Sequence, residues 1–388
     1  MYDTSKNCYD SLPVYQSPEL VVQDLNPDYP IYCIRPEAIH RVAKKFCDNF
    51  PGDVLYAVKC NPSRHMLNQL HKAGIRHFDT ASLSEIELIS DMFDYGASYF
   101  MHPIKSRSAI KRAYSEHQVN YFVIDHPSEL QKISELIPPS RDVILVVRVA
   151  VDNSGATYEL SSKFGANPDL ARDLVREVLE KGFGYGIAFH VGSQCLSVEG
   201  YETGLQLVAM ILQSFDEPPA CIDIGGGFPA QYVNSSGPDL EMYMESIIRE
   251  IESLELPSSC RLFCEPGRAL SADGESLIVQ VQLRKDKALY LNDGMYGNMI
   301  EEKYGLRLPV RAVQSRQFSI ETMSYTAYGP TCDALDIYPA TLSLPSDIEE
   351  GDWIEFGQIG AYGAACRTNF NGFFSDVSVI VENEFNVV

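Results

Sequence analysis

The chain has 388 residues, of which 45% are hydrophobic and 22% are charged. This length suits a barrel of roughly 200–250 residues plus a second domain, and the composition is typical of a globular protein with a large core. The net charge of −22 argues against nucleic acid or an anionic membrane surface as a partner. No apolar run is long enough to span a membrane and the N-terminus does not resemble a signal peptide, so we expect a cytoplasmic protein.

The ten cysteines are scattered along the chain and form no CxxC pair. Several of them, including Cys33, Cys221 and Cys264, lie within apolar runs. Scattered thiols of this kind are typical of reduced core residues. We therefore expect neither a disulfide framework nor a metal site.

Short apolar runs recur between residues 54 and 267, and stretches with helical periodicity separate them. The runs begin at Val54, His77, Ser98, Tyr121, Val143, Gly184, Cys221 and Arg261. Strands that alternate with helices at this spacing indicate βαβ units and a parallel sheet. Eight such units predict an α/β fold with a closed (β/α)8 TIM-type barrel over residues 36–267.

Polar residues and glycines follow these strands where each one ends. In chain order they are Lys59, Asp79, His102, Asp125, Arg148, His190, Gly225 to Gly227, and Glu265. Barrel enzymes keep their catalytic residues at this carboxyl edge. The edge is therefore the predicted active site.

The pattern changes after residue 268, where apolar residues alternate with polar ones in several short runs separated by glycine turns. This alternation predicts antiparallel strands and a second β domain, sandwich-like or barrel-like, over residues 268–388. The run PIYCI, within residues 1–35, is a further strand that we expect to join this domain.

Lys59 ends the first of the barrel strands. A lysine in such a place is usually a solvated surface residue. At the catalytic edge of a barrel, however, a lysine can form a Schiff base with an aldehyde cofactor such as pyridoxal phosphate (PLP), and burial would lower its pKa.

The three glycines at 225–227 follow the seventh strand, and Arg268 follows the eighth. They could form a flexible turn, but bare backbone N–H groups also let a phosphate approach closely. Barrels often place a phosphate site here, with arginine as a suitable second ligand.

Glu265 and His190 have ordinary interpretations as a paired carboxylate and a structural histidine. Beside PLP, Glu265 would keep the pyridine nitrogen protonated, so that the ring accepts electrons. His190 would stack on the ring and Ser193 would bind the phosphate.

The segment GPTCDALD lies in the predicted β domain. Cys332 is a candidate proton donor, and Asp333 is a candidate carboxylate for a substrate ammonium. Near the C-terminus, Tyr362 is a further candidate phosphate ligand and Phe370 a candidate apolar wall.

The motifs YAVKCN, FDTAS, KFGA, HVGS, DIGGGFP, EPGR, GPTCD, GAY and FNGF occur in this order over almost the whole chain. Together they resemble the PLP-dependent ornithine, lysine, arginine and diaminopimelate decarboxylases, which have a barrel of the alanine-racemase type (fold type III). GPTCD followed by ALD, and the FNGF motif, are most similar to the ornithine decarboxylase branch. The diaminopimelate branch typically has glutamate after this cysteine.

The resemblance implies a catalytic set of Lys59, Cys332, His190 and Glu265. It implies an obligate homodimer, in which Cys332 and Asp333 reach into the partner's site and Tyr296 and Phe370 contact substrate. The residues that it implies around PLP are Lys59, Asp79, Glu85, Arg148, His190, Ser193, Gly225, Gly226, Gly227, Glu265, Arg268 and Tyr362.

The implied activity is decarboxylation of a basic L-amino acid, with L-ornithine converted to putrescine for polyamine biosynthesis. One position departs from that branch. The ornithine enzymes carry an aspartate for the distal ammonium nine residues after the tyrosine of NDGMYG, where this chain has Gly305. Glu301 and Glu302 lie just before it.

Four alternatives follow from these observations. Two are a lysine/ornithine decarboxylase of broader specificity and a diaminopimelate decarboxylase. A racemase would need a tyrosine base where Cys332 stands. A catalytically inactive regulatory homologue would typically have lost the lysine or the phosphate residues, which this chain retains.

Overall fold

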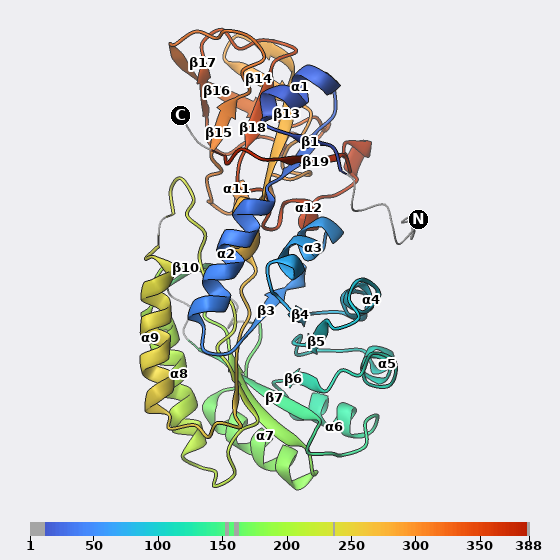
Figure 1. Cartoon of the computed structure of the whole chain (residues 1–388), viewed down its shortest axis with the longest axis vertical. Coiled ribbons are helices and arrows are strands. Elements are labelled where there is room, and N and C mark those ends of the chain that lie inside the picture. The colour runs from blue at the N-terminus through green and yellow to red at the C-terminus, as the bar shows by residue number, and fades with distance from the viewer. Residues whose placement is uncertain (1–11, 152–154, 159–162, 236, 386–388) are drawn as a thin grey trace.

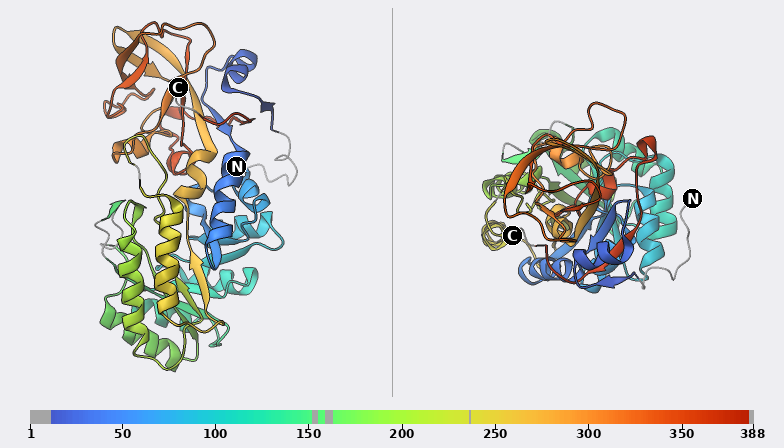
Figure 2. Two further views of the ribbon diagram at one scale, coloured as in Figure 1. Left: turned by 60° about the vertical axis from the view of Figure 1, so that its left-hand side comes forward. Right: turned by 90° about the horizontal axis from the view of Figure 1, so that it is seen from above.

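The computed structural model describes residues 12–151, 155–158, 163–235 and 237–385. The molecule is elongated, with a helix-covered barrel at one end and a β domain at the other (Figure 1). The same division is visible after rotation about the long axis (Figure 2). Among the described residues, no helix has the length and apolar character needed to cross a bilayer.

Eight parallel strands close into a barrel, and this confirms the predicted fold. The hydrogen-bonded order is β11-β12-β3-β4-β5-β6-β7-β9, so strands adjacent in the chain are mostly adjacent in space. The strands are β3 (Asp53–Ala57), β4 (His77–Thr80), β5 (Ala97–Phe100), β6 (Tyr121–Ile124), β7 (Ile144–Val149), β9 (Gly184–Phe189), β11 (Cys221–Asp223) and β12 (Arg261–Cys264).

Helices form the outer ring of the barrel, and the sequence marks where several of them begin. The Ser63 and Ser82 side chains accept N–H groups of the first turns of their helices, and Asn167 does the same for α7. The ring contains α2 (Pro36–Asn49), α3 (Arg64–Lys72), α4 (Leu83–Met92), α5 (Arg107–His117), α6 (Pro127–Ser134), α7 (Pro168–Glu180), α8 (Glu199–Leu212) and α9 (Leu240–Ser253).

Asp53 closes the barrel at the end opposite the predicted active site. Its carboxylate accepts a hydrogen bond of 2.7 Å from Arg261 Nη2 and lies 3.2 Å from His77 Nε2. Hydrogen bonds from His77 and Arg261 lower the pKa of the Asp53 carboxyl to about 2, although partial burial opposes them. These contacts join strands β3, β4 and β12, so this cluster stabilises the point where the barrel closes.

Replacing Asp53 with asparagine should lower the free energy of unfolding by about 1 kcal/mol near pH 7, a figure reduced for solvent screening because the side chain is half-buried. The pKa is lower in the folded chain than in the unfolded one. The stabilisation is therefore complete above the ordinary pKa and is lost as the pH falls toward about 2. Urea unfolding of both proteins at neutral and acidic pH checks this. A difference that does not shrink in acid contradicts it.

The second domain is built around the long strand β13 (Glu275–Lys285), which pairs antiparallel with β2, β14 and β18. The N-terminal strand β2 lies between β13 and β19, so residues near both ends of the chain complete one sheet. The strands are β1 (Val14–Tyr15), β2 (Ile31–Ile34), β13, β14 (Ala288–Leu291), β15 (Val310–Ala312), β16 (Thr322–Tyr328), β17 (Leu342–Pro345), β18 (Trp353–Phe356) and β19 (Ser378–Val381).

This sheet is mainly antiparallel, as expected, but the pairings β1–β19, β19–β2 and β14–β16 are parallel. The parallel pairs arise where the chain returns from a distant segment. The exact division at residues 267 and 268 stays a prediction, since β12 ends at Cys264 and β13 begins at Glu275. Residues 1–11 and 386–388, which the sequence assigns to this domain, lie outside the residues that the structure describes.

Several short elements complete the two domains, and α1 among them packs on the β domain, away from the barrel (Figure 1). Strands β8 and β10 form a small antiparallel ribbon above the barrel. The remaining elements are α1 (Pro18–Leu25), β8 (Ala156–Tyr158), β10 (Ser193–Cys195), α10 (Arg268–Ser271), α11 (Ile300–Lys303), α12 (Gly363–Cys366) and single 3₁₀ turns at Val58–Cys60, Ala272–Gly274 and Phe370–Gly372.

Candidate active site

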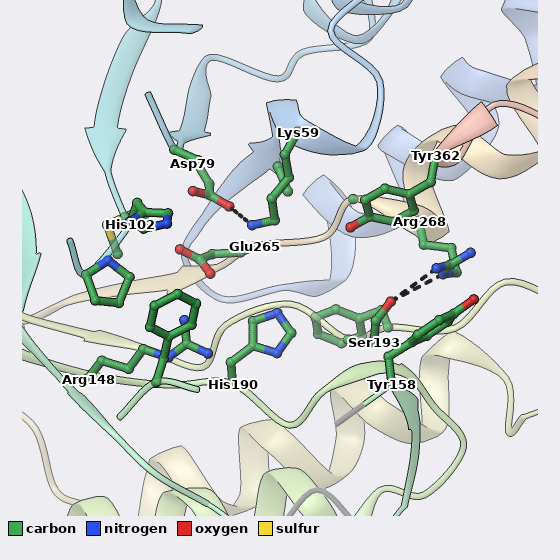
Figure 3. A pocket seen from close by; sticks show the side chains of 18 of the residues that line it. Lys59, Asp79, His102, Arg148, Tyr158, His190, Ser193, Glu265, Arg268 and Tyr362 are labelled. Atoms are coloured by element: carbon green, nitrogen blue, oxygen red, sulfur yellow. Dashed lines mark hydrogen bonds and ion pairs between the residues drawn. The ribbon is translucent and has the colours of Figure 1, made fainter. Parts of the chain in front are cut away.

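A cavity of about 340 Å³ opens at the carboxyl edge of the barrel, where the β domain faces it. Most of the predicted site residues converge there (Figure 3). The residues labelled around it are Lys59, Asp79, His102, Arg148, Tyr158, His190, Ser193, Glu265, Arg268 and Tyr362. Asp125 is an exception, because its carboxylate instead accepts the Gly165 N–H at 2.9 Å.

Lys59 enters the cavity from a 3₁₀ turn that directly follows β3. Its neighbours Val58 and Cys60 are buried, so the turn holds the backbone against the core. The Lys59 Nζ lies 2.6 Å from Asp79 Oδ2, and the Asp79 side chain is only 2% exposed. The amine is thus fixed in the site by a carboxylate from the neighbouring strand β4.

The expected lowering of the Lys59 pKa is wrong for this arrangement. Burial alone would lower it, but the negative charges of Asp79 and Glu265 outweigh burial and raise the pKa of the Lys59 ammonium. Sequence reasoning failed here because both carboxylates come from other strands. The Lys59 amine must lose a proton before it can act as a nucleophile, so a bound ligand has to offset the charges of Asp79 and Glu265.

Glu265 follows β12 and lies at the centre of the cavity wall. Burial, then the nearby charges of Asp223 and Asp79, raise the pKa of the Glu265 carboxyl well above its ordinary value. A hydrogen bond with Asp223 adds to this effect, so the pair tends to retain a proton. A carboxyl group with a raised pKa can share its proton with the basic nitrogen of a bound ring.

His190 presents a flat, uncharged ring to the same cavity. Burial, and then the positive charges of Arg148 and Lys59, lower its pKa well below the ordinary value. Its Nδ1 accepts the Gly192 N–H at 3.0 Å, which fixes the ring orientation. A neutral imidazole held in this way suits stacking on an aromatic ligand.

The glycine turn after β11 forms one wall of the site. Gly227 has a φ of +100°, and a Cβ there would lie 2.4 Å from the Gly192 carbonyl oxygen. Glycine is required at this position both by conformation and by space. Gly227 lines the cavity without a side chain, so a phosphate can approach the backbone there, whereas the Gly225 N–H is taken by Asp223 Oδ1 at 2.8 Å.

Arg268 lies beside that turn and presents one edge of its guanidinium to Ser193. The Ser193 Oγ is 3.4 Å from Arg268 Nε and 3.3 Å from Nη2. The other edge is occupied, since Nη1 donates to Tyr232 OH at 3.0 Å and to Glu301. The Tyr362 ring covers the guanidinium at 4.9 Å. The Nε–Nη2 edge is thus oriented for two-pronged contact with an anion.

These groups match PLP, a flat ring that carries an aldehyde, a basic nitrogen and a phosphate on different sides. Figure 3 shows Lys59, Glu265 and Arg268 on different sides of the cavity, with His190 below it. An amine can hold the aldehyde, a carboxyl the nitrogen, and an arginine with glycine N–H groups the phosphate. The barrel and this site define the class of barrel-fold PLP enzymes.

Comparison with known proteins narrows this class. Residues 36–272 match the family described as "Pyridoxal-dependent decarboxylase, pyridoxal binding domain". The lysine/ornithine decarboxylase of Selenomonas ruminantium is 33% identical over 344 residues, which cover 85% of this chain and 84% of that protein. Antizyme inhibitor 2 of Xenopus laevis is 32% identical over 359 residues, which cover 82% of this chain and 73% of that protein. The chain therefore belongs to the pyridoxal-dependent decarboxylase family.

Comparison of the fold with solved structures points to the same family. The crystal structure of Paramecium bursaria Chlorella virus arginine decarboxylase bound to agmatine matches with a TM-score of 0.84 at 25% identity, covering 94% of this chain and 100% of that one. The protein is a PLP-dependent decarboxylase of basic amino acids. This confirms the predicted family, its fold, its cofactor and its enzyme class.

The predicted substrate residues form a separate group in the β domain. Tyr296 OH donates to Asp333 Oδ2 at 2.7 Å, and the Tyr296 and Phe370 rings lie 4.9 Å apart. Cys332 N–H donates to Asn371 Oδ1 at 3.1 Å. Among the described residues that line the cavity, none belongs to this cluster. Within one chain, the substrate residues and the cofactor residues are therefore brought to different places.

Some cavity residues were not foreseen as site residues. Tyr158 comes from the short strand β8 and stacks over Arg268, with 5.5 Å between the guanidinium carbon and the ring centre. A three-residue strand outside the barrel repeat has no periodicity that would reveal it. Glu85, implied by the resemblance, accepts the Ala81 N–H at 2.6 Å, which fixes the loop after Asp79, and its place beside the cofactor stays a prediction.

Proposed function

We propose that this decarboxylase converts L-ornithine to putrescine, a step of polyamine biosynthesis, and that L-lysine is its second substrate. The observation that carries the proposal is the cavity in which Lys59, Glu265 and Arg268 present an amine, an acid and a cationic fork to one ligand. The lysine/ornithine decarboxylase named above is the relative that supports this pair of substrates.

When bound, PLP supplies a ring that accepts the electrons left on Cα as carbon dioxide departs. Lys59 holds the cofactor through its amine, and Glu265 keeps a proton at the position of the ring nitrogen. His190 covers one face and, being neutral, adds no charge there. Arg268, Ser193 and the glycine turn hold the phosphate, while Asp79 and Arg148 complete the charged surroundings.

We further propose a homodimer in which each site takes residues from both chains. Cys332 is exposed and contacts Asn371, and Phe370, Phe373 and Phe374 of that same segment are each 43–44% exposed. Exposed aromatic groups of this kind favour a covered interface. In the dimer, Cys332 of the partner subunit would donate the proton to Cα, and Phe370 of the partner subunit would exclude water from the departing carboxylate.

Asp333 of the partner subunit is the carboxylate that we propose for the distal ammonium. Gly305 carries no acid, and a Cβ added there would meet no atom within 4 Å. The Glu302 carboxylate is taken by Arg307 and by the Leu308 N–H. Glu301 pairs with Arg268.

A substrate panel tests this proposal. Carbon dioxide release from ornithine, lysine, arginine and meso-diaminopimelate should be highest with ornithine, then lysine. Asp333→Ala should raise KM for ornithine at least about tenfold, because a hydrogen bond to a charged group contributes about 1.5–3 kcal/mol. Glu350→Ala, an exposed acid of the same domain, is the control. Turnover of diaminopimelate alone contradicts the proposal.

The other activities are less well supported. A racemase needs a tyrosine base at the position of Cys332. The match to an antizyme inhibitor raises a regulatory, non-catalytic alternative, but the chain keeps Lys59, the glycine turn and Arg268 in one cavity. A protein without visible cofactor absorbance and without turnover would favour that alternative.

A further inference from the structure

Two neighbouring turns of the β domain carry the proposed substrate residues. The first turn, residues 293–299, follows β14 and carries Tyr296. The second, residues 329–336, follows β16 and carries Cys332 and Asp333. The second turn ends at Asp336, whose side chain is buried at 3% exposure although it carries a carboxylate.

The Asp336 carboxylate joins these two turns. Oδ1 accepts the Met295 N–H at 2.8 Å, and Oδ2 accepts the Thr331 N–H at 3.0 Å and the Thr331 hydroxyl at 2.7 Å. Met295 directly precedes Tyr296, and Thr331 directly precedes Cys332. One buried side chain therefore fixes the backbone next to both functional positions.

Glycines on both turns make this close approach possible. A Cβ on Gly294 would lie 2.3 Å from Asp336 Oδ1, and a Cβ on Gly329 would lie 2.2 Å from the same atom. Any larger residue at either position would displace the carboxylate. The second turn is closed by Gly329 N–H to the Asp336 carbonyl at 2.9 Å and by Asp336 N–H to the Asp333 carbonyl at 3.1 Å.

We infer that Asp336 is a positioning residue, whose carboxylate sets where Tyr296, Cys332 and Asp333 stand relative to one another. A hydrogen bond from Tyr296 OH to Asp333 Oδ2, at 2.7 Å, links the same two turns at a second point. The inference rests on the proposed shared-site dimer. In that dimer, Asp336 acts on the partner's active site and not on the site that contains its own Lys59.

Asp336→Asn keeps the size of the side chain but replaces one acceptor oxygen with an NH₂ group. That group would face an N–H or O–H donor of Met295 or Thr331, so one turn must shift. We expect kcat for ornithine to fall by about tenfold or more, the effect of losing a hydrogen bond to a charged group. Cofactor content should stay at the wild-type level, because the cavity is built by other residues.

Subunit mixing separates this role from a general loss of structure. Lys59→Ala subunits are mixed in equal amounts with Asp336→Asn subunits and allowed to exchange. In a mixed dimer, one site combines the intact Lys59 of one chain with the intact turns of the other. Random pairing makes half of the dimers mixed, so activity should recover to about a quarter of the wild-type value.

The matched control mixes Lys59→Ala with Cys332→Ala subunits and tests the shared site by itself. Recovery in both mixtures supports the role of Asp336. Recovery only with Cys332→Ala overturns that role but leaves the shared-site dimer standing. Recovery in neither mixture overturns the shared site and the inference with it, as does wild-type kcat in the Asp336→Asn homodimer.

A milder variant covers the case in which Asp336→Asn does not fold. Thr331→Val removes only the 2.7 Å hydroxyl bond to Oδ2 and should give a smaller fall in kcat, again complemented by Lys59→Ala subunits. Thr331→Ser keeps the hydroxyl and should restore kcat. Equal activity of the Val and Ser variants contradicts the inference.

Discussion

Replacing Lys59 with alanine should abolish turnover and remove the visible absorbance of the bound cofactor. The cavity offers this one amine beside Asp79, and alanine leaves nothing to hold the cofactor's aldehyde. The loss should exceed that of every other single substitution proposed for this site. Absorbance spectra and carbon dioxide release from purified protein measure both effects.

Lys111→Ala is the matched control, because Lys111 is an exposed lysine on the outer helix α5. It should keep both colour and turnover. Activity in the Lys59→Ala protein would remove Lys59 from the mechanism. Colour that persists without turnover would mean that the cofactor is attached elsewhere.

Replacing Glu265 with glutamine should reduce kcat by about 100-fold or more, the size expected when one preorganised electrostatic group is removed. The amide cannot hold a proton for the ring nitrogen, so the ring accepts electrons less readily. Cofactor content should change little, since Lys59 and the phosphate ligands are intact. Turnover per bound cofactor is therefore the quantity to measure.

Glu129→Gln is a useful comparison, because Glu129 is also a buried carboxylate but pairs with Lys105 and Lys132 away from the cavity. It should leave turnover per bound cofactor unchanged, even if stability falls. A Glu265→Gln enzyme within about twofold of the wild-type value would show that the ring nitrogen needs no acid.

The barrel could be predicted because its strands are covered on both faces. Runs such as that of β7 (Ile144–Val149) are almost continuously apolar and carry a polar residue close to their carboxyl end, here Arg148, so both the strand and its catalytic end are visible in the sequence. Strands β15 and β17 were not predicted. They are short, and their pairing with β18 and β16 depends on tertiary contacts.

The convergence of the predicted cofactor residues on one cavity could likewise be predicted, but not their electrostatics. Their places after the first and the eighth barrel strand made Lys59, Glu265 and Arg268 candidates, and the order of the motifs then supported them. The raised pKa of Lys59 depends on how closely Asp79 approaches, which only the closed barrel determines. The role inferred for Asp336 depends on two turns that are distant in the sequence and touch only in the fold.

Chemical mapping of the cofactor attachment tests the central claim most directly. Borohydride treatment of the protein saturated with PLP makes the bond between the cofactor and its lysine permanent, and digestion then locates the labelled peptide. We predict one labelled peptide, the one that contains Lys59. A label on another lysine, such as the buried Lys105, or no label at all would contradict this account.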